Sequence, residues 1–157
     1  MTPSETATSL RDDRMQLPAM RADTFRAIVR ASAMYDLIAT APFMTPWSLA
    51  LAIGMIDDLH TRLGLPGTLP AFEATHYLFA GLMGSVVVVW SLARIHLGAP
   101  ILGRYDAVAR LLFALWQVYA VANGATPIIL LFTVFEITFG ILQALPVNSR
   151  AAATTSG

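Results

Sequence analysis

The sequence predicts an all-α fold, an integral membrane four-helix bundle, from three observations. The first is composition: 56% of the 157 residues are hydrophobic and 13% are charged, whereas soluble domains carry roughly 25% charged residues. The second is a series of four apolar segments, and the third is the placement of arginine between them. The length suits one domain.

The first apolar segment, 31–56, is interrupted by proline. Its only ionisable residue is Asp36, and a run of this length is sufficient for a membrane core, which needs about 20 residues. Pro42 and Pro46 interrupt the run. The sequence therefore predicts a first span that is either kinked there or broken, with one helix ending near Thr40 and another starting at the second proline.

Three further apolar segments follow an exposed, mildly acidic loop at 57–73. The second span is predicted over 75–93, the third over 106–122 and the fourth over 127–145. The fourth span begins with proline, a residue tolerated in the first turn of a helix because its missing N–H has no helical partner there. Four spans would make one bundle.

Loop charge predicts the orientation of the bundle, because positive residues favour the cytoplasmic side of a membrane. The arginines gather in the N-terminal flank, in the connection between the second and third spans, and in the C-terminal tail. We therefore expect a multi-pass protein of the bacterial inner membrane with both ends in the cytoplasm. Segments 1–20 and 147–157 are predicted to be mobile cytoplasmic tails on either side of a bundle over 21–146.

Each predicted span carries one polar or small face, so the bundle is expected to enclose a polar centre. An ionisable side chain in hydrocarbon costs a few kcal/mol on insertion scales, and Glu136 falls near the middle of the fourth span. We hypothesise that Glu136 and Asp36 lie in this centre with Arg110 or Arg94 as counter-charges. The predicted buried polar residues are Asp36, Arg110, Gln117, Glu136 and Gln143.

A simpler interpretation stays open for each charge. Arg94 and Arg110 lie near the cytoplasmic ends of their spans and can extend to the lipid headgroups without a partner. Asp106 precedes Arg110 by four residues, a spacing that also suits a surface ion pair. Glu136 can be a neutral carboxyl group that hydrogen-bonds a neighbouring helix.

Small residues are predicted to be helix-packing positions, because they let neighbouring backbones approach closely. In the second span these are Gly81, Gly84 and Ser85, and in the fourth span Gly140.

The sequence predicts no catalytic site and no metal site. Cysteine is absent, which excludes disulfides, thiolate ligands and cysteine nucleophiles. His60 and His76 could meet Asp57, Asp58 or Glu73 on one side of the membrane and hold a divalent cation there, but scattered loop carboxylates are usually just solvated. No phosphate-binding loop, nucleophile elbow or H-E-x-x-H pair is present. With a net charge of zero the chain has no general field to attract nucleic acid.

In length, in its four apolar segments and in its interrupted first segment, the chain resembles the DoxX-like group of small bacterial membrane proteins over residues 25–146. The resemblance is one of layout and assigns no role to any residue. Members of that group are implicated as membrane partners of redox enzymes, which implies contact with quinone. Side chains that would form quinone-binding walls between the helices are Trp90, Trp116, Phe113 and Met83.

These observations leave three functions open. The first, which the sequence favours, is an accessory or assembly subunit of a larger membrane complex, bound to another membrane protein or a second copy through the small-residue faces. The resemblance implies a redox link for this subunit. The second is a proton-coupled carrier that uses Glu136 and Asp36, although no second half of the chain mirrors the break at Pro42 and Pro46. The third is a quinone-linked oxidoreductase subunit or, more generally, a quinone- or lipid-binding protein that uses the same carboxylates. An enzyme is disfavoured because few polar residues gather at one membrane face.

Overall fold

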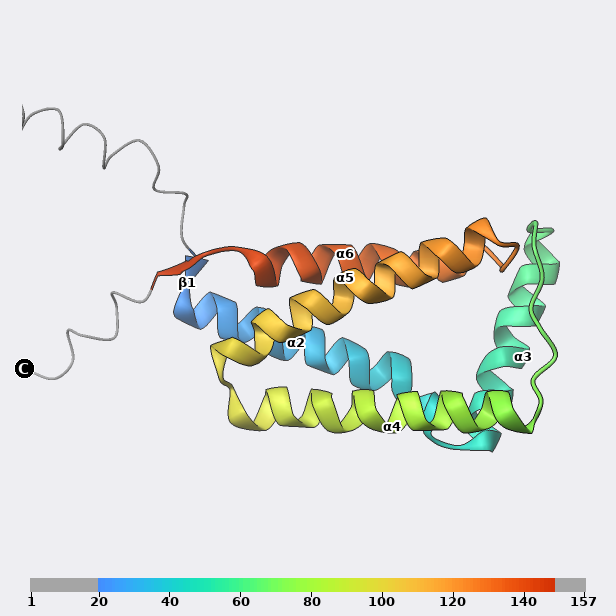
Figure 1. Ribbon diagram of the computed structural model, residues 1–157, viewed down its shortest axis with the longest axis horizontal. Helices are drawn as coiled ribbons and strands as arrows, with labels where there is room; N and C mark the ends of the chain where they lie inside the picture. Colours follow the sequence, from blue (N-terminus) through green and yellow to red (C-terminus); the bar gives the residue numbers. More distant parts are fainter. Residues whose placement is uncertain (1–19, 149–157) are drawn as a thin grey trace, which may run out of the picture.

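The computed structural model describes residues 20–148 and is all-α apart from two strands of two residues each (Figure 1). The all-α prediction is confirmed. In chain order the elements are β1 (Met20–Arg21), α2 (Ala22–Thr40), η1 (Ala41–Met44), α3 (Pro46–Leu63), α4 (Ala74–Leu97), α5 (Pro100–Ala122), α6 (Ile129–Ala144) and β2 (Val147–Asn148). Most of the two predicted tails, residues 1–19 and 149–157, lies outside the described residues.

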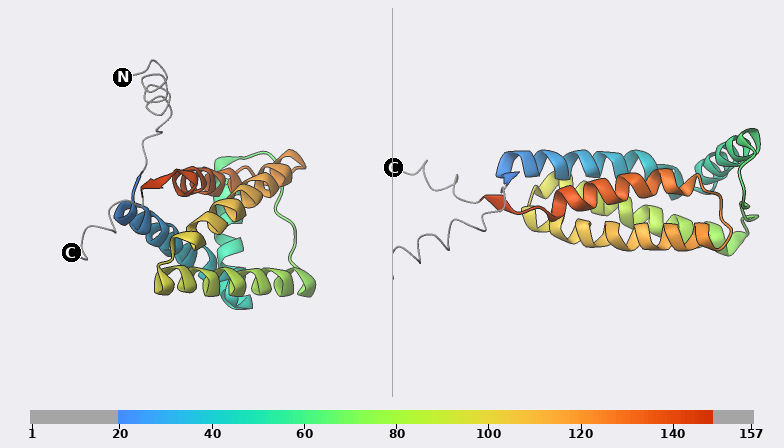
Figure 2. Two further views of the ribbon diagram at one scale, coloured as in Figure 1. Left: turned by 60° about the vertical axis from the view of Figure 1, so that its left-hand side comes forward. Right: turned by 90° about the horizontal axis from the view of Figure 1, so that it is seen from above.

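Four long helices, α2, α4, α5 and α6, form a bundle. The most extensive packing is between α5 and α6, and α2 packs on α4 and also contacts both α5 and α6. α5 diverges from α4 after the short turn that joins them (Figure 1). Two further views show α3 at the end of the bundle away from β1 and β2 (Figure 2).

The first apolar segment is broken at its two prolines. α2 ends at Thr40, the 3-10 helix η1 follows, and α3 starts at Pro46 with an axis bent by 108° from the preceding helix. Of the two predicted alternatives, the broken one is therefore observed, and 31–56 is not a single helix. Pro42 lies in the first turn of η1, where it has no N–H to continue the hydrogen bonding of α2.

Side-chain hydrogen bonds hold the start of α3 in its new direction. Thr45 is the N-cap residue, and its Oγ1 accepts a hydrogen bond from the backbone N–H of Ser48 at 3.2 Å. The Ser48 hydroxyl donates to the carbonyl oxygen of Pro42 at 2.7 Å. An N-cap bond of this kind stabilises a helix by about 1 kcal/mol. α3 therefore starts as an independently capped helix and not as a bent continuation of α2.

The predicted acidic loop over 57–73 is helical in its first part. α3 continues to Leu63 and ends at Gly64, whose φ of 58° is the left-handed conformation common at helix ends. The rest of the loop packs against the turn between α5 and α6, where the backbone N–H of Thr68 donates to the carbonyl oxygen of Gly124 at 2.9 Å. His60 of α3 reaches the same turn, with 2.8 Å between its Nδ1 and the Oγ1 of Thr126.

The other helices extend differently from the predicted spans. α4 continues past residue 93 to Leu97, and α5 starts at Pro100 and not at residue 106, while α6 lies within 127–145. The predicted second span ends just before Arg94, and Gly98, Pro100 and Gly103 favour a turn before the third span. Arg94 is instead buried and paired inside the bundle, and Pro100 lies in the first turn of α5, where its missing N–H has no helical partner.

Both ends of the described chain lie at the same end of the bundle. β1 and β2 pair in parallel with Met20 opposite Val147, and the backbone N–H of Met20 donates to the carbonyl oxygen of Pro146 at 2.8 Å. Met20, Val147 and Asn148, predicted to belong to the tails, are therefore hydrogen-bonded parts of the fold. This end also contains the turn between α4 and α5 (Figure 1).

By length and composition, one helix among the described residues, α4, is able to cross a membrane by itself. α2 with η1 and α3 passes the same test only as a bent pair, and α6 is apolar but has 16 residues. α5 has 23 residues and carries Arg104, Asp106 and Arg110. The described helices thus supply one or two membrane-crossing segments on these criteria.

Polar and apolar side chains are distributed in the opposite way from a water-soluble bundle. Among residues 20–148, ten polar or charged residues are buried but only five apolar ones other than glycine. Thirty-two large hydrophobic side chains are exposed. Soluble proteins rarely bury so many polar groups or expose so much apolar surface, so both features set this bundle apart from them. The buried apolar side chains are Phe25, Val29, Ala33, Leu49 and Ala114.

Candidate functional site

Five charged side chains from four helices meet in the interior of the bundle and are called the ionic cluster here. α2 contributes Asp36, α4 contributes Arg94, α5 contributes Asp106 and Arg110, and α6 contributes Glu136. None of the five residues is more than 8% exposed. Because each of the four helices supplies at least one member, assembly of the cluster requires the complete bundle.

Arg110 connects three helices through one guanidinium group. Its Nε donates to Oδ2 of Asp106 at 2.9 Å, its Nη1 to Oε2 of Glu136 at 2.7 Å, and its Nη2 to Oδ2 of Asp36 at 2.7 Å. Bonds between a guanidinium and a carboxylate are roughly twice as strong as bonds between neutral groups. The arginine, the most deeply placed charge of α5, therefore binds α2 and α6 to that helix.

Arg94 is fully buried and forms the second centre of the cluster. Its guanidinium is paired with the carboxylates of Asp36 and Asp106, and its Nη2 donates to the hydroxyl of Ser91 at 3.0 Å. The indole Nε1 of Trp90 donates to the other carboxylate oxygen of Asp106 at 3.0 Å. Arg94 is thus anchored within the bundle and does not extend to the surface.

Ser32 lies between the two arginines. Its Oγ accepts hydrogen bonds from Arg94 Nη1 at 3.0 Å, from Arg110 Nη2 at 3.3 Å and from Gln143 Nε2 at 2.6 Å. Its own hydroxyl hydrogen has Asp106 Oδ2 within reach at 3.3 Å. One small hydroxyl group, 0% exposed, therefore links α2 to α4, α5 and α6.

The formal charges of the cluster do not balance. Two guanidinium groups face three carboxylates, which gives a net charge of −1 when all five groups are ionised. Asp36 and Asp106 each contact both arginines, whereas Glu136 contacts only Arg110. An uncompensated charge in the low-dielectric interior costs several kcal/mol. A proton or an additional cation would make the cluster neutral, and Glu136 is the least compensated member.

Hydrogen bonding in the cluster is also incomplete. Within the described part of the chain, Arg94 Nε and Gln143 Oε1 are buried without a hydrogen-bond partner. Buried polar atoms in native proteins almost always have a partner. The ionic cluster therefore keeps one unused donor on Arg94, and the neighbouring Gln143 keeps one unused acceptor.

Gln117 lies outside the ionic cluster, about two helical turns beyond Arg110 on α5. The hydroxyl of Thr133 donates to Oε1 of Gln117 at 2.7 Å, and Thr133 precedes Glu136 by one turn. Of the five predicted polar residues, the structure brings together Asp36, Arg110, Glu136 and Gln143, while Gln117 belongs to a second, smaller polar contact between α5 and α6.

The predicted packing glycines make contacts within the chain. A Cβ atom on Gly84 would lie 2.8 Å from Cβ of Phe43 in η1, and one on Gly81 would lie 3.8 Å from the carbonyl oxygen of Phe43. A Cβ on Gly140 would lie 3.6 Å from Cβ of Arg110. Ser85 is half-buried. At Gly84 the small-residue face of α4 therefore accommodates the broken segment of the same chain.

The sequence did not reveal every member of the cluster. The sequence suggests Asp106 only as a surface ion-pair partner of Arg110, and Arg94 only as an alternative to Arg110 as the counter-charge. The available indication was helical spacing: Asp106 and Arg110 are four residues apart, as are Trp90 and Arg94. Spacing alone shows which residues share a face of their own helix, but not that the faces of α4 and α5 converge on Ser32.

The four side chains expected to line a quinone-binding site do not come together at one place. Met83 and Trp116 are 59% and 66% exposed, on α4 and α5 respectively. Trp90 is engaged with Asp106 in the ionic cluster. Phe113 is half-buried. The four side chains therefore do not enclose a common cavity.

Comparisons with protein-family models, with curated protein sequences and with solved structures found no significant match. The layout resemblance to the DoxX-like group stays a prediction. Function is inferred below from the ionic cluster, the surface and the broken first segment.

Proposed function

We propose that the protein is a proton-coupled carrier embedded in a membrane by all four apolar segments, with the ionic cluster as its proton-binding centre. The observation that supports this most directly is the cluster itself: three carboxylates and two arginines enclosed by helices whose outer faces are apolar. In hydrocarbon an unbalanced carboxylate is costly, and intramembrane carboxylates recur in proton relays.

By length and composition alone, α5 and α6 do not qualify as membrane-crossing helices. Their exposed faces nevertheless support a membrane location. α5 carries three charges, but Asp106 and Arg110 are buried, while its exposed side includes Val108, Leu111 and Leu115. A lipid tail would therefore meet apolar side chains along this helix. α6 spans about 24 Å at 1.5 Å per residue, and a short span is accommodated by local thinning of the bilayer.

The charged residues at the two ends of the bundle support one orientation of the protein in the membrane. The end of the bundle with β1, β2 and the turn between α4 and α5 carries the arginine-rich flanks, and the other end carries the acidic residues of α3. The positive-inside tendency places the arginine-rich end in the cytoplasm. We propose a bacterial inner-membrane location with both ends inside.

The broken segment supports a carrier more than a static subunit. Discontinuous helices are typical of the binding regions of carriers. Asp36 lies one turn before the end of α2, and the hydroxyl of Thr40 donates to the carbonyl oxygen of Asp36 at 2.6 Å. A change in the angle between α2 and α3 would therefore be transmitted over a short distance to a member of the ionic cluster.

The first experiment asks whether the cluster holds a proton. Infrared difference spectra between low and high pH, recorded in lipid nanodiscs, should contain a carbonyl band from a protonated carboxyl group. Glu136→Gln should remove this band, because the amide supplies a neutral side chain of the same shape. Glu73→Gln, a change at the exposed start of α4, should leave the band in place. A spectrum without such a band at any pH at which the protein is folded would contradict a proton-binding centre.

The second experiment measures proton movement directly. Proteoliposomes with an internal pH-sensitive dye and an imposed potassium diffusion potential should acidify faster than empty liposomes, and Glu136→Gln should reduce the rate to the empty-liposome level. The competing accessory-subunit hypothesis expects no flux. It expects a second polypeptide in native mass spectra of the protein released from its own membrane in mild detergent. A stable partner that survives Glu136→Gln, together with no flux, would favour that hypothesis.

A further inference from the structure

We propose that a pocket between α3, residues 69–72 and the start of α4 binds a small organic cation, an ammonium group attached to a short apolar body. The pocket lies at the end of the bundle away from β1 and β2, and none of its lining residues belongs to the ionic cluster. The proposal is independent of the proton-binding centre and adds a ligand site to the protein.

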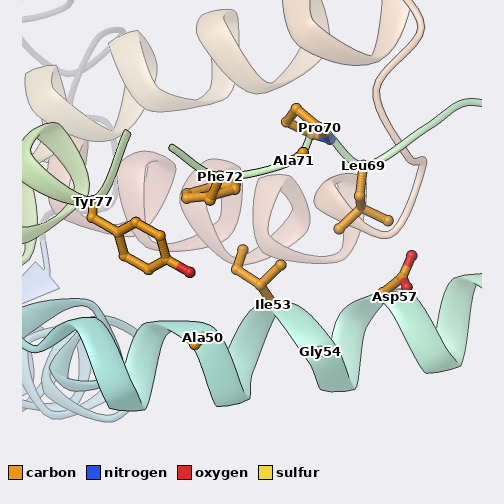
Figure 3. Close-up of a pocket in the computed structure, with 9 residues that line it drawn as sticks. All are labelled: Ala50, Ile53, Gly54, Asp57, Leu69, Pro70, Ala71, Phe72 and Tyr77. Atoms are coloured by element: carbon orange, nitrogen blue, oxygen red, sulfur yellow. The ribbon is translucent and has the colours of Figure 1, made fainter. Parts of the chain in front are cut away.

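The pocket is open to its surroundings and has the volume of a small-molecule site. Its volume is about 380 Å³, within the range of about 300–1,000 Å³ for ligand pockets. Figure 3 shows the side chains of Ile53, Leu69, Phe72 and Tyr77 between the α3 ribbon and the 69–72 segment, with the Tyr77 hydroxyl group directed toward α3. The lining residues are Ala50, Ile53, Gly54, Asp57, Leu69, Pro70, Ala71, Phe72 and Tyr77.

Asp57 supplies the only formal charge among the lining residues. Its carboxylate is exposed and forms no ion pair within residues 20–148. The adjacent Asp58 differs, because its carboxylate pairs with Nε of Arg62 at 2.9 Å. A negative group beside apolar walls attracts a cation and disfavours an anion.

Two aromatic rings add to this preference. The rings of Phe72 and Tyr77 lie edge to face with 5.7 Å between their centroids, and both residues line the pocket. An alkylammonium group within about 6 Å of an aromatic face is stabilised by the ring quadrupole. Carboxylate, aromatic rings and aliphatic walls together match a cation with an apolar body better than a neutral or anionic molecule.

Local hydrogen bonds hold the walls of the pocket in place without a ligand. Glu73 and His76 form a capping box at the start of α4, in which the backbone N–H of Glu73 donates to Nδ1 of His76 at 3.0 Å. The other end of the segment is fixed by the hydrogen bond of Thr68 to Gly124. A site that is organised before binding loses less conformational entropy when the ligand arrives.

The test is a calorimetric titration of the full-length protein in nanodiscs with hexyltrimethylammonium, corrected with empty nanodiscs. Saturable binding with one site per chain is expected. Hexanol and hexanoate have similar apolar bodies without the positive charge, and they should bind at least about tenfold more weakly, as expected when the charge and cation–π contributions are both lost. Equal binding of hexanol would overturn the proposal, because the site would then be apolar only.

Two neighbouring carboxylates provide a matched pair of variants. Asp57→Asn should weaken hexyltrimethylammonium binding by about fivefold, the upper range for one exposed ion pair. Asp58→Asn should leave binding unchanged, because that carboxylate is paired with Arg62 outside the pocket. Equal effects of both variants would overturn the proposal, since they would indicate a general surface charge effect. Loss of binding in Glu136→Gln with Asp57→Asn unaffected would place the cation in the ionic cluster and would also overturn it.

Discussion

At the scale of single residues, the interior is held together by charge-assisted hydrogen bonds in place of apolar contacts. Arg94 and Arg110 are among the largest fully buried side chains, and together they contact three carboxylates. In a soluble protein such a network is weak evidence for stability, because desolvation of the charges offsets their attraction. In the proposed membrane location, unpaired charges would face hydrocarbon and not water, so pairing inside the bundle would be their most favourable arrangement.

Ser32 provides a direct test of this network. Ser32→Ala removes the oxygen that accepts hydrogen bonds from Arg94, Arg110 and Gln143, so we expect a loss of about 1–3 kcal/mol in the free energy of unfolding, the cost of unsatisfied buried donors. Ser85→Ala on the half-buried face of α4 is the control and should change stability little. The measurement is reversible denaturation in detergent followed by circular dichroism. Equal effects of the two variants would contradict a central role for Ser32.

The pair of Arg110 and Glu136 is suited to a double-mutant cycle. Arg110→Met and Glu136→Gln should be coupled by about 0.5–3 kcal/mol in unfolding free energy, as is typical of residues in one network. The exposed pair of Arg62 and Asp58, also at hydrogen-bond distance, is the control and should be coupled by at most about 0.5 kcal/mol. A coupling no larger than that of the control would mean that Glu136 is held by packing alone.

At the scale of elements, the break between α2 and α3 and the close approach of η1 to α4 depend on each other. Pro42 and Pro46 redirect the chain, and Phe43 between them packs directly onto Gly84. A glycine at this position of α4 permits the contact, since a Cβ would lie 2.9 Å from the backbone carbonyl carbon of Phe43. The proline break and the glycine are therefore two parts of one packing arrangement.

Glycine substitutions distinguish this contact from ordinary helix positions. Gly84→Ala should destabilise the protein by about 1–3 kcal/mol, the usual cost of overpacking, because η1 has to move away. Gly54→Ala on α3 has nothing within 4 Å of the added Cβ and should stabilise by about 0.5–1 kcal/mol through helix propensity. Thermal unfolding of both variants in the same detergent gives the comparison. Stabilisation by Gly84→Ala would contradict the close approach of η1 to α4.

At the scale of the whole molecule, the apolar exterior and the shared location of both described ends lead to one prediction of topology. The chain has no cysteine, so single cysteines can be introduced as reporters. Thr68→Cys, at the α3 end, should react with a membrane-impermeant maleimide in intact cells. His96→Cys, at the end near β1 and β2, should react only after the membrane is permeabilised. Both side chains are exposed.

The reverse labelling pattern would place the arginine-rich end outside the cytoplasm and contradict the proposed orientation. Labelling of both positions in intact cells would contradict a bundle that crosses the membrane. The two cysteine variants share one chain background, so each serves as the control for expression and reactivity of the other.

Several features could be predicted from the sequence because they depend on local chemistry. The helical class follows from long apolar runs, and the break follows from Pro42 and Pro46, which cannot continue the hydrogen bonding of a helix. Asp36, Glu136, Arg110 and Gln143 stand out because each is a polar group in an apolar run. Helix ends were predicted less well, because Arg94 near the end of α4 suggested contact with water, and Pro100 and Gly103 near the start of α5 suggested a turn.

Sequence alone determined that this chain has apolar helices with a few polar groups placed on one face of each. Only the tertiary structure decided which of those groups meet: that Arg94 turns inward, that Asp106 is shared by both arginines, and that Ser32 lies between them. It also decided that Gln117 pairs with Thr133 outside the cluster. The physical reason is that periodicity fixes the direction of a side chain around its own helix, whereas the meeting of side chains depends on the relative depth and rotation of four helices packed together.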